Sequence, residues 1–292
     1  MDYREILDIA SDQIVKMCGE TIDIIQLNKP TSVEQAKELT KIVSKLSPVF
    51  GNMIEFKAVE RLNAINWGNL GRWVRQDPGF PDALFVSNQL DVPPGIEIKT
   101  WYPLSTEITA RFKESKSMFK DDNTLVALMC WIPEYVVYGR AKIIDVWIGT
   151  ASGIAKSRDA HYHDPPGYLV MEPGGTSDRT SNLIQTNTGG YKFQGTASEL
   201  DEAKRLMKDM IIDEEYSIDQ GYQDKIMTLR GEFKYRMDTN YAKIDRIQHE
   251  GIELFKSLAL QQEYMGKTIS EWKSVLCTKS KIDSVLAELL DL

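Results

Sequence analysis

The sequence predicts an α/β fold in which a mixed central sheet is flanked by helices, with a helical region at the C-terminal end. Short runs rich in β-branched and aromatic residues in the middle of the chain predict the sheet. Segments with apolar residues at helical spacing before and after these runs predict the flanking helices. Since 292 residues can bury one large core or two modest ones, we expect one main domain with a helical extension.

Two helices are expected before the sheet. Thr31 and Ser32 are N-cap candidates for the first, whose apolar residues recur at helical spacing until Pro48. Proline lacks the backbone N–H of a helical hydrogen bond, so Pro48 should end this helix. A second helix of about fifteen residues should then begin at Gly51.

Four strands are the minimum that the middle of the chain indicates, at residues 82–87, 96–100, 124–132 and 142–149. Residues that favour turns (Gly, Pro, Asn and Asp) bound these runs. Between the second and the third run, the apolar spacing over 105–119 is compatible with a helix on one face of the sheet.

The rest of the chain divides into an irregular segment and a helical region. Residues 150–196 are rich in Gly, Pro, Ser, Thr and Asn, and such a stretch inside a compact protein is usually functional or disordered. Its scattered aromatic and basic groups favour a function. Helical spacing returns at Ser198, so we expect a core over 1–197, loop-rich from about 150–197, and a helical region over 198–292.

The composition is that of an ordinary globular protein, with 42% hydrophobic and 27% charged residues. No apolar stretch reaches the roughly 18 residues of a membrane span, and the first residues are charged where a signal peptide needs an apolar core. We therefore expect a cytoplasmic protein with no membrane partner. The net charge of -8 argues against a protein that coats nucleic acid indiscriminately, but it leaves room for a local basic cleft.

A charged pair should leave the second predicted strand on one side. Glu97 and Lys99 are two residues apart, so both side chains point to one face while the isoleucines beside them point into the core. Asp82 begins the preceding strand, and the turn-rich segment 88–95 can fold the two strands into a hairpin. This hairpin brings Asp82 beside Glu97, so that two carboxylates suited to a hard cation converge with one ammonium.

These residues resemble the active-site motif of the PD-(D/E)XK nuclease superfamily, and within it the type II restriction endonucleases. The match consists of Pro81-Asp82, a gap of fourteen residues, and Glu97-Ile98-Lys99. The surrounding elements match more loosely, over about Gly51 to Gly149. The phrase GIEIKT also looks like the corresponding segment of the MutH branch.

The resemblance implies a restriction-endonuclease-like fold and a type II site-specific deoxyribonuclease of a prokaryotic restriction system. Such an enzyme depends on Mg²⁺ and cuts both strands of double-stranded DNA at a specific sequence, leaving 5′-phosphate ends. Asp82 and Glu97 would hold the Mg²⁺ ion, which polarises the scissile phosphate and lowers the pKa of a bound water. Lys99 would position that water and steady the developing charge.

Glu55 is a further catalytic candidate, because nucleases of this superfamily often carry an acidic residue on the helix before the hairpin. It shares a helical face with Ala58, Val59 and Leu62, and a carboxylate directed toward apolar neighbours needs a partner or a metal. The alternative is that Glu55 or Glu60 merely lies at the border of the apolar stripe.

Basic and amide side chains near the motif are candidates for DNA binding. Those that follow the catalytic strand could meet phosphates, and those in the irregular segment are of types that read base edges. The candidates are Arg111, Lys113, Lys116, Arg158, His161, His163, Arg179, Gln185, Asn187 and Lys192. His161 and His163 also raise the question of a zinc site, but no Cys or third His lies near them in the sequence.

The C-terminal region is expected to form helices, one of which opens with a capping box at Thr268 and Glu271. Its apolar positions, such as Phe255, Leu258 and Tyr264, fit either a subunit interface or an intramolecular cap. Cleavage of a palindromic site needs two active sites related by a two-fold axis, which favours a homodimer.

Two other functions fit parts of the pattern. A MutH-like or structure-specific DNA repair endonuclease would nick DNA or cut branched substrates. A non-enzymatic helical interaction protein, in which the motif is accidental, would bind no metal.

Overall fold

The computed structural model describes residues 1–76, 79–105, 108, 110–112, 119, 122–162, 171–173, 198, 201, 205, 220, 221, 224, 235–237, 243–278 and 282–291. The chain forms two compact units. The sheet unit comprises Met1–Ala110, Asp121–Ala151 and Glu250–Leu292, and the second unit comprises Arg111–Lys120 and Ser152–His249. The boundary expected after residue 197 does not separate these units, because the segment from Glu250 belongs with the sheet.

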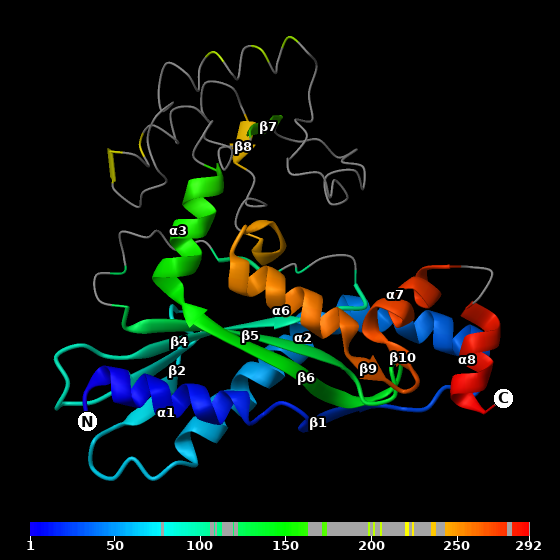
Figure 1. Cartoon of the computed structure of the whole chain (residues 1–292), viewed down its shortest axis with the longest axis horizontal. Coiled ribbons are helices and arrows are strands. Elements are labelled where there is room, and N and C mark those ends of the chain that lie inside the picture. The colour runs from blue at the N-terminus through cyan, green and yellow to red at the C-terminus, as the bar shows by residue number, and fades with distance from the viewer. Residues whose placement is uncertain are drawn as a thin grey trace. The chain divides into compact units, whose positions relative to one another are not determined.

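The sheet unit is organised around one six-stranded mixed sheet (Figure 1). In spatial order its strands are β1 (Thr21–Leu27), β6 (Gly139–Thr150), β5 (Thr124–Pro133), β4 (Gly95–Trp101), β3 (Ala83–Val86) and β2 (Arg72–Arg75). β4 and β5 are parallel, whereas every other neighbouring pair is antiparallel. The predicted α/β class is confirmed, and the four predicted strands correspond to β3, β4, β5 and β6.

The two strands that the sequence did not indicate, β1 and β2, lie at the two edges of the sheet. In β1 only Ile22 is buried, and in β2 only Trp73 is. An edge strand with one buried side chain shows little of the apolar alternation by which a strand is recognised. For this reason the sequence indicates only helices before residue 82, one that begins at Thr31 or Ser32 and one at Gly51.

Helices cover both faces of the sheet. The helices of the sheet unit are α1 (Tyr3–Val15), α2 (Val33–Asn63), α6 (Glu250–Gln261), α7 (Ile269–Cys277) and α8 (Ile282–Leu290). Phe50 of α2 contacts Trp131 of β5, and Phe255 of α6 contacts Trp101 of β4, with ring centroids 4.7 Å and 5.9 Å apart. Trp101 is paired with Cys130 in the parallel β4–β5 pair, so these two side chains point to the same face of the sheet. Successive residues of a strand point to opposite faces, so Trp131 points to the other face. The helices α2 and α6, which contact Trp131 and Trp101, therefore lie on opposite sides of the sheet.

The prediction that Pro48 ends a helix is wrong, because α2 continues through it to Asn63. A proline inside a helix removes one backbone hydrogen bond and costs about 3 kcal/mol. Buried residues on both sides of it, Val43 and Phe50 among them, pack into the same core. Packing of the apolar face supplies most of a helix's stability in a protein, so the two predicted helices are one.

The helix expected over 105–119 is absent from the part of that range that the structure describes. Residues 105, 108, 110–112 and 119 have no helical conformation, and Arg111 forms a β-bridge with Lys243. Ile108 and Phe112 are nevertheless fully buried. Their spacing therefore reflects burial of irregular chain and not a helical period.

The second unit contains most of α3 (Ala151–Tyr162) and the two-stranded antiparallel sheet of β7 (Met171–Pro173) and β8 (Tyr235–Met237). It also contains the short 3-10 helix Ile244–Arg246. The segment from residue 150, which was expected to be irregular, thus begins with a helix. The helical region was predicted over 198–292. Most of its first part, up to residue 242, lies outside the described residues.

The predicted capping box at the start of α7 is confirmed. The Thr268 hydroxyl accepts a hydrogen bond from the Glu271 N–H, and a Glu271 carboxylate oxygen accepts one from the Thr268 N–H. Phe255, which was a candidate for a subunit interface, is buried against Trp101 inside the unit. Within the described ranges, no helix combines the length and the apolar character that a membrane span requires.

Candidate active site

The predicted hairpin of β3 and β4 is confirmed, and it sets Asp82 beside Glu97. The antiparallel register pairs Ala83 with Ile96, so Asp82 lies just beyond the last paired position. Beyond that point β3 no longer covers the edge of β4. The Asp82 carboxylate takes its place there, because its Oδ2 accepts a hydrogen bond of 2.7 Å from the Ile98 N–H.

Each of the two carboxylates accepts a hydrogen bond from a backbone N–H of the opposite strand segment. Besides the bond from Ile98 to Asp82, the Asp82 N–H donates a hydrogen bond of 3.0 Å to Glu97 Oε2. Each side chain therefore has one oxygen fixed by a rigid peptide group. Side chains held in this way lose little conformational freedom when they bind a ligand.

Lys99 completes the group, which we call the Lys99 cluster (Asp82, Glu97 and Lys99). Its Nζ forms an ion pair with Glu97 Oε1 and another, at 3.6 Å, with Asp82 Oδ2. The exposed fractions of the side chains are 6% for Glu97, 15% for Asp82 and 18% for Lys99. Charges so little exposed interact more strongly than surface pairs do, and they also cost more to leave unpaired.

Glu55 of α2 is the third carboxylate of this region. Its Oε1 accepts a hydrogen bond of 2.6 Å from Arg75 Nε, and its side chain is largely buried. Burial raises the pKa of Glu55, and the nearby Asp82 adds to this effect, whereas Arg75 and Lys99 oppose it. Asp82 and Lys99 are thus close enough to act on Glu55. Glu60, the other acid considered, is more exposed and pairs with Lys57.

Arg75 was not among the predicted site residues. It ends β2 opposite Ala83, and the next residue, Gln76, donates its N–H to the Asp82 carbonyl. A strand that carries arginine at its end is common, so the sequence alone offered no reason to assign Arg75 to Glu55. The contact depends on the pairing of β2 with β3, which the sequence did not indicate.

The backbone before Asp82 is fixed by a close approach of Gly95. A Cβ atom at position 95 would overlap Pro81 Cγ and lie 3.2 Å from Pro81 Cβ. Only glycine fits here without displacing the proline ring, which directly precedes Asp82.

Gly95→Ala is therefore expected to lower the free energy of unfolding by about 1–3 kcal/mol, as overpacking of a filled core does. Urea unfolding measures this effect. A variant as stable as the wild type would show that a Cβ atom fits at position 95, against the close approach of Pro81.

The donor set of the Lys99 cluster suits Mg²⁺. Among the described residues, no three His, Cys, Asp or Glu side chains are grouped so as to hold a metal ion. Mg²⁺, however, keeps several waters and commonly uses only one or two protein carboxylates together with substrate phosphates. Asp82 and Glu97 provide two hard oxygen donors that already converge on a cation, the Lys99 ammonium. The residues present therefore fit Mg²⁺.

Comparison of the chain with models of protein families, with curated proteins and with solved structures found no match. What the site does must consequently be argued from its own geometry.

Of the predicted DNA-binding residues, Arg158 is placed where it cannot meet DNA. It is fully buried, and its Nη1 donates a hydrogen bond of 2.7 Å to the Phe112 carbonyl inside the second unit. Arg111 is exposed, and His161 lies in α3 with its side chain outside the description. The other candidates lie outside the described residues: Lys113, Lys116, His163, Arg179, Gln185, Asn187 and Lys192.

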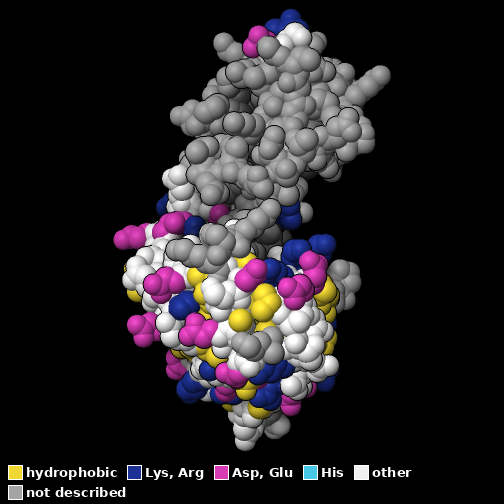
Figure 2. All heavy atoms as spheres, turned by 90° about the vertical axis from the view of Figure 1, so that its right-hand side faces the viewer, with side chains coloured by type: hydrophobic (Ala, Val, Ile, Leu, Met, Phe, Trp, Pro, Cys, Tyr) yellow, Lys and Arg dark blue, Asp and Glu magenta, His cyan; other side chains and the backbone are white. Residues whose placement is uncertain are grey.

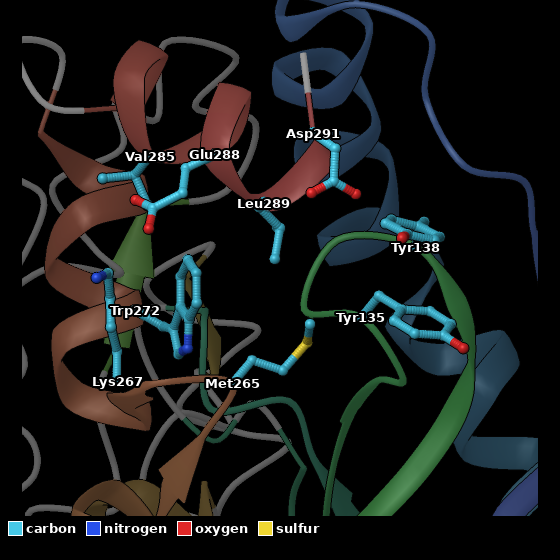
Figure 3. A pocket seen from close by; sticks show the side chains of 9 residues that line it. All are labelled: Tyr135, Tyr138, Met265, Lys267, Trp272, Val285, Glu288, Leu289 and Asp291. Atoms are coloured by element: carbon cyan, nitrogen blue, oxygen red, sulfur yellow. The ribbon is translucent and has the colours of Figure 1, made fainter.

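The end of the sheet unit that carries α7 and α8 is not a basic surface. Figure 2 views this end and shows that the described Lys and Arg side chains are interspersed there with Asp and Glu. A pocket of about 380 Å³ lies at the same end, between the turn at Tyr135 and Tyr138 and the helix residues Trp272 and Leu289 (Figure 3). It contains no residue of the Lys99 cluster, and its acids Glu288 and Asp291 make it a poor phosphate site.

Proposed function

We propose that this chain is a Mg²⁺-dependent endonuclease that hydrolyses phosphodiesters of double-stranded DNA, of the type II restriction class. The observation that carries the proposal is the convergence of the Asp82 and Glu97 carboxylates on Lys99 Nζ, from the residue just before β3 and from its partner strand β4. The order and spacing of these residues are those of the PD-(D/E)XK motif that the sequence resembles. A restriction-endonuclease-like fold is part of this proposal.

Each residue of the cluster has a task in such a reaction. Bound Mg²⁺ would polarise the scissile phosphate and make an attacking water more acidic. Asp82 and Glu97 hold the ion in a fixed place, because one oxygen of each is already bound by a backbone N–H. The Lys99 ammonium lies against both carboxylates, from where it orients the attacking water and offsets the negative charge that develops on the phosphate oxygens.

The proposal includes a homodimer on DNA and a place in the cytoplasm of a prokaryotic cell. A cut through both strands of a two-fold symmetric site uses two active sites. Leu254 and Leu258, one turn apart on α6, are both exposed and offer an apolar contact for a second subunit.

Digestion of a fully sequenced plasmid tests the proposal. With Mg²⁺ the wild-type protein should give discrete linear fragments with 5′-phosphate ends, and with EDTA it should give none. Lys41→Ala, which removes an exposed lysine paired with Glu38, is the matched control for Lys99→Ala and should cut like the wild type.

Two results would contradict the proposal. Nicked circles without linear product would favour the MutH-like repair enzyme. No cleavage, together with no heat of binding for Mg²⁺ or Mn²⁺, would favour the non-enzymatic interaction protein.

A further inference from the structure

The pocket in Figure 3, which we call the α8 pocket, lies within the sheet unit and has a volume of about 380 Å³. The β5–β6 turn, α7 and α8 line it, together with the hairpin of β9 (Glu263–Tyr264) and β10 (Lys267–Thr268). Its apolar lining consists of Tyr135, Tyr138, Met265, Trp272, Val285 and Leu289. The proposed DNA cleavage gives these residues no role, because none of them belongs to the Lys99 cluster.

The β5–β6 turn is held in a conformation that its sequence does not favour. Val136 has a φ of 66°, in the left-handed region that a β-branched residue seldom adopts, and its side chain is fully buried. The Tyr264 hydroxyl donates a hydrogen bond of 2.7 Å to the Glu134 carbonyl, and Trp272 Nε1 donates one of 2.6 Å to the Tyr264 carbonyl. These bonds join the turn to the β9–β10 hairpin and to α7, so this wall of the pocket is fixed before anything binds.

The fixed wall presents apolar groups to solvent. Tyr135 and Tyr138 stack with ring centroids 4.7 Å apart, and 41% of Tyr135 is exposed. Met265, at the tip of the hairpin, is 46% exposed. Figure 3 shows Met265 pointing toward Tyr135, and Leu289 pointing into the space between Met265 and Trp272. Tyrosine, tryptophan and methionine are enriched in protein–protein interfaces, so the composition of this exposed surface favours a protein partner.

The rim of the pocket on the α8 side is negative. Glu288 lies in the last turn of α8, Asp291 follows its end, and that turn contains no basic residue. The carbonyl groups at the C-terminus of a helix carry partial negative charge, so a cation is favourable there and further acids are not. Lys29 offsets Asp291, with 3.5 Å between Nζ and Oδ2. Glu288 has no such partner among the described residues.

The cation that lines the pocket does not neutralise Glu288. Lys267 Nζ lies 5.6 Å from the centroid of the Trp272 ring, and within the described part of the chain it forms no ion pair with an acid. The Glu288 carboxylate at the end of α8 is therefore complementary to a cation supplied by a partner. The same negative rim disfavours a strand of nucleic acid.

We propose that the α8 pocket docks a segment of another protein in which a large apolar side chain lies next to an arginine or lysine. The apolar side chain enters between Tyr135, Met265 and Leu289, and the cation reaches Glu288 at the end of α8. A rigid apolar pocket with a charged rim is the usual construction of an interface hot spot. This interaction goes beyond the proposed nuclease and does not depend on it.

Selection from a random peptide library displayed on phage, with the immobilised wild-type protein as bait, tests the proposal. We expect the enriched peptides to share one large apolar residue with arginine or lysine beside it. The most enriched peptide is then labelled, and fluorescence anisotropy gives its Kd. No enrichment, or a consensus with aspartate or glutamate beside the apolar residue, would overturn the proposal.

Two variants locate the binding site of the selected peptide. Leu289→Arg places a charged side chain in the pocket and should raise the Kd by roughly thirtyfold, the effect of losing one hot-spot contact. Ile42→Arg is the matched control, because Ile42 is an apolar residue of α2, 47% exposed, that does not line the pocket. It should bind the peptide like the wild type, and circular dichroism checks that both variants fold.

A charge exchange tests the assigned role of Glu288 at an exposed position, where the fold should persist. Glu288→Lys should raise the Kd of the basic peptide by about fivefold, as the loss of an exposed ion pair predicts. A peptide with glutamate in place of its cation should bind Glu288→Lys more tightly than it binds the wild type. Equal peptide affinities of Leu289→Arg and Ile42→Arg, or a Glu288→Lys protein with the wild-type preference for the basic peptide, would contradict the assignment.

Discussion

Glu97→Gln is expected to lower Mg²⁺-supported cleavage of DNA by about a thousandfold, which corresponds to about 4 kcal/mol of lost transition-state stabilisation. The amide removes one negative metal ligand but keeps an oxygen that can accept the hydrogen bond from the Asp82 N–H. The fold should therefore persist while the metal is lost. Single-turnover digestion of plasmid DNA, with circular dichroism to check the fold, measures the effect.

Glu60→Gln is the matched control for this experiment. Glu60 lies on α2, and its half-exposed carboxylate pairs with Lys57. Its variant should cut at the wild-type rate. If Glu97→Gln retains the turnover of Glu60→Gln, the assignment of the site is wrong.

Lys99→Met is expected to destabilise the protein in the absence of divalent metal by about 3–5 kcal/mol. Methionine keeps the unbranched apolar stem but removes the charge that two largely buried carboxylates share. Mg²⁺ should restore part of the loss, because an ion that binds only the folded chain stabilises it by mass action. Urea unfolding with and without Mg²⁺ measures both effects.

The corresponding exposed pair again provides the comparison. Lys57→Met breaks a surface ion pair with Glu60, and such pairs contribute at most about 1 kcal/mol. Its stability should not respond to Mg²⁺ beyond the response of the wild type. The account would be contradicted if the two lysine variants lost equal amounts of unfolding free energy, or if Mg²⁺ did not stabilise Lys99→Met. The Lys99 cluster would then behave as an ordinary surface group.

The core of the candidate site was predictable from sequence because it is local. Asp82, Glu97 and Lys99 lie within eighteen residues of chain, on two strands joined by a short turn-rich segment, so strand period and hairpin pairing alone bring them together. The resemblance to the nuclease motif depends on the same three residues.

Features that depend on distant parts of the chain were not predictable in this way. Arg75 reaches Glu55 only because β2 pairs with β3 and α2 runs through Pro48 to the same place. Arg158 looked like a surface cation, yet its guanidinium is buried on a backbone carbonyl. In both cases tertiary packing decides the surroundings of a charged side chain, and these surroundings cannot be predicted from the neighbouring residues in the sequence.

A crystal of the wild-type protein soaked in Mn²⁺ tests the central claim most directly, through the anomalous difference map. We expect one strong peak between the carboxylates of Asp82 and Glu97, about 2.1–2.2 Å from an oxygen of each, with the Lys99 ammonium displaced from the line between them. A map without a peak there at saturating Mn²⁺, or with its strongest peak on other side chains, would contradict the account.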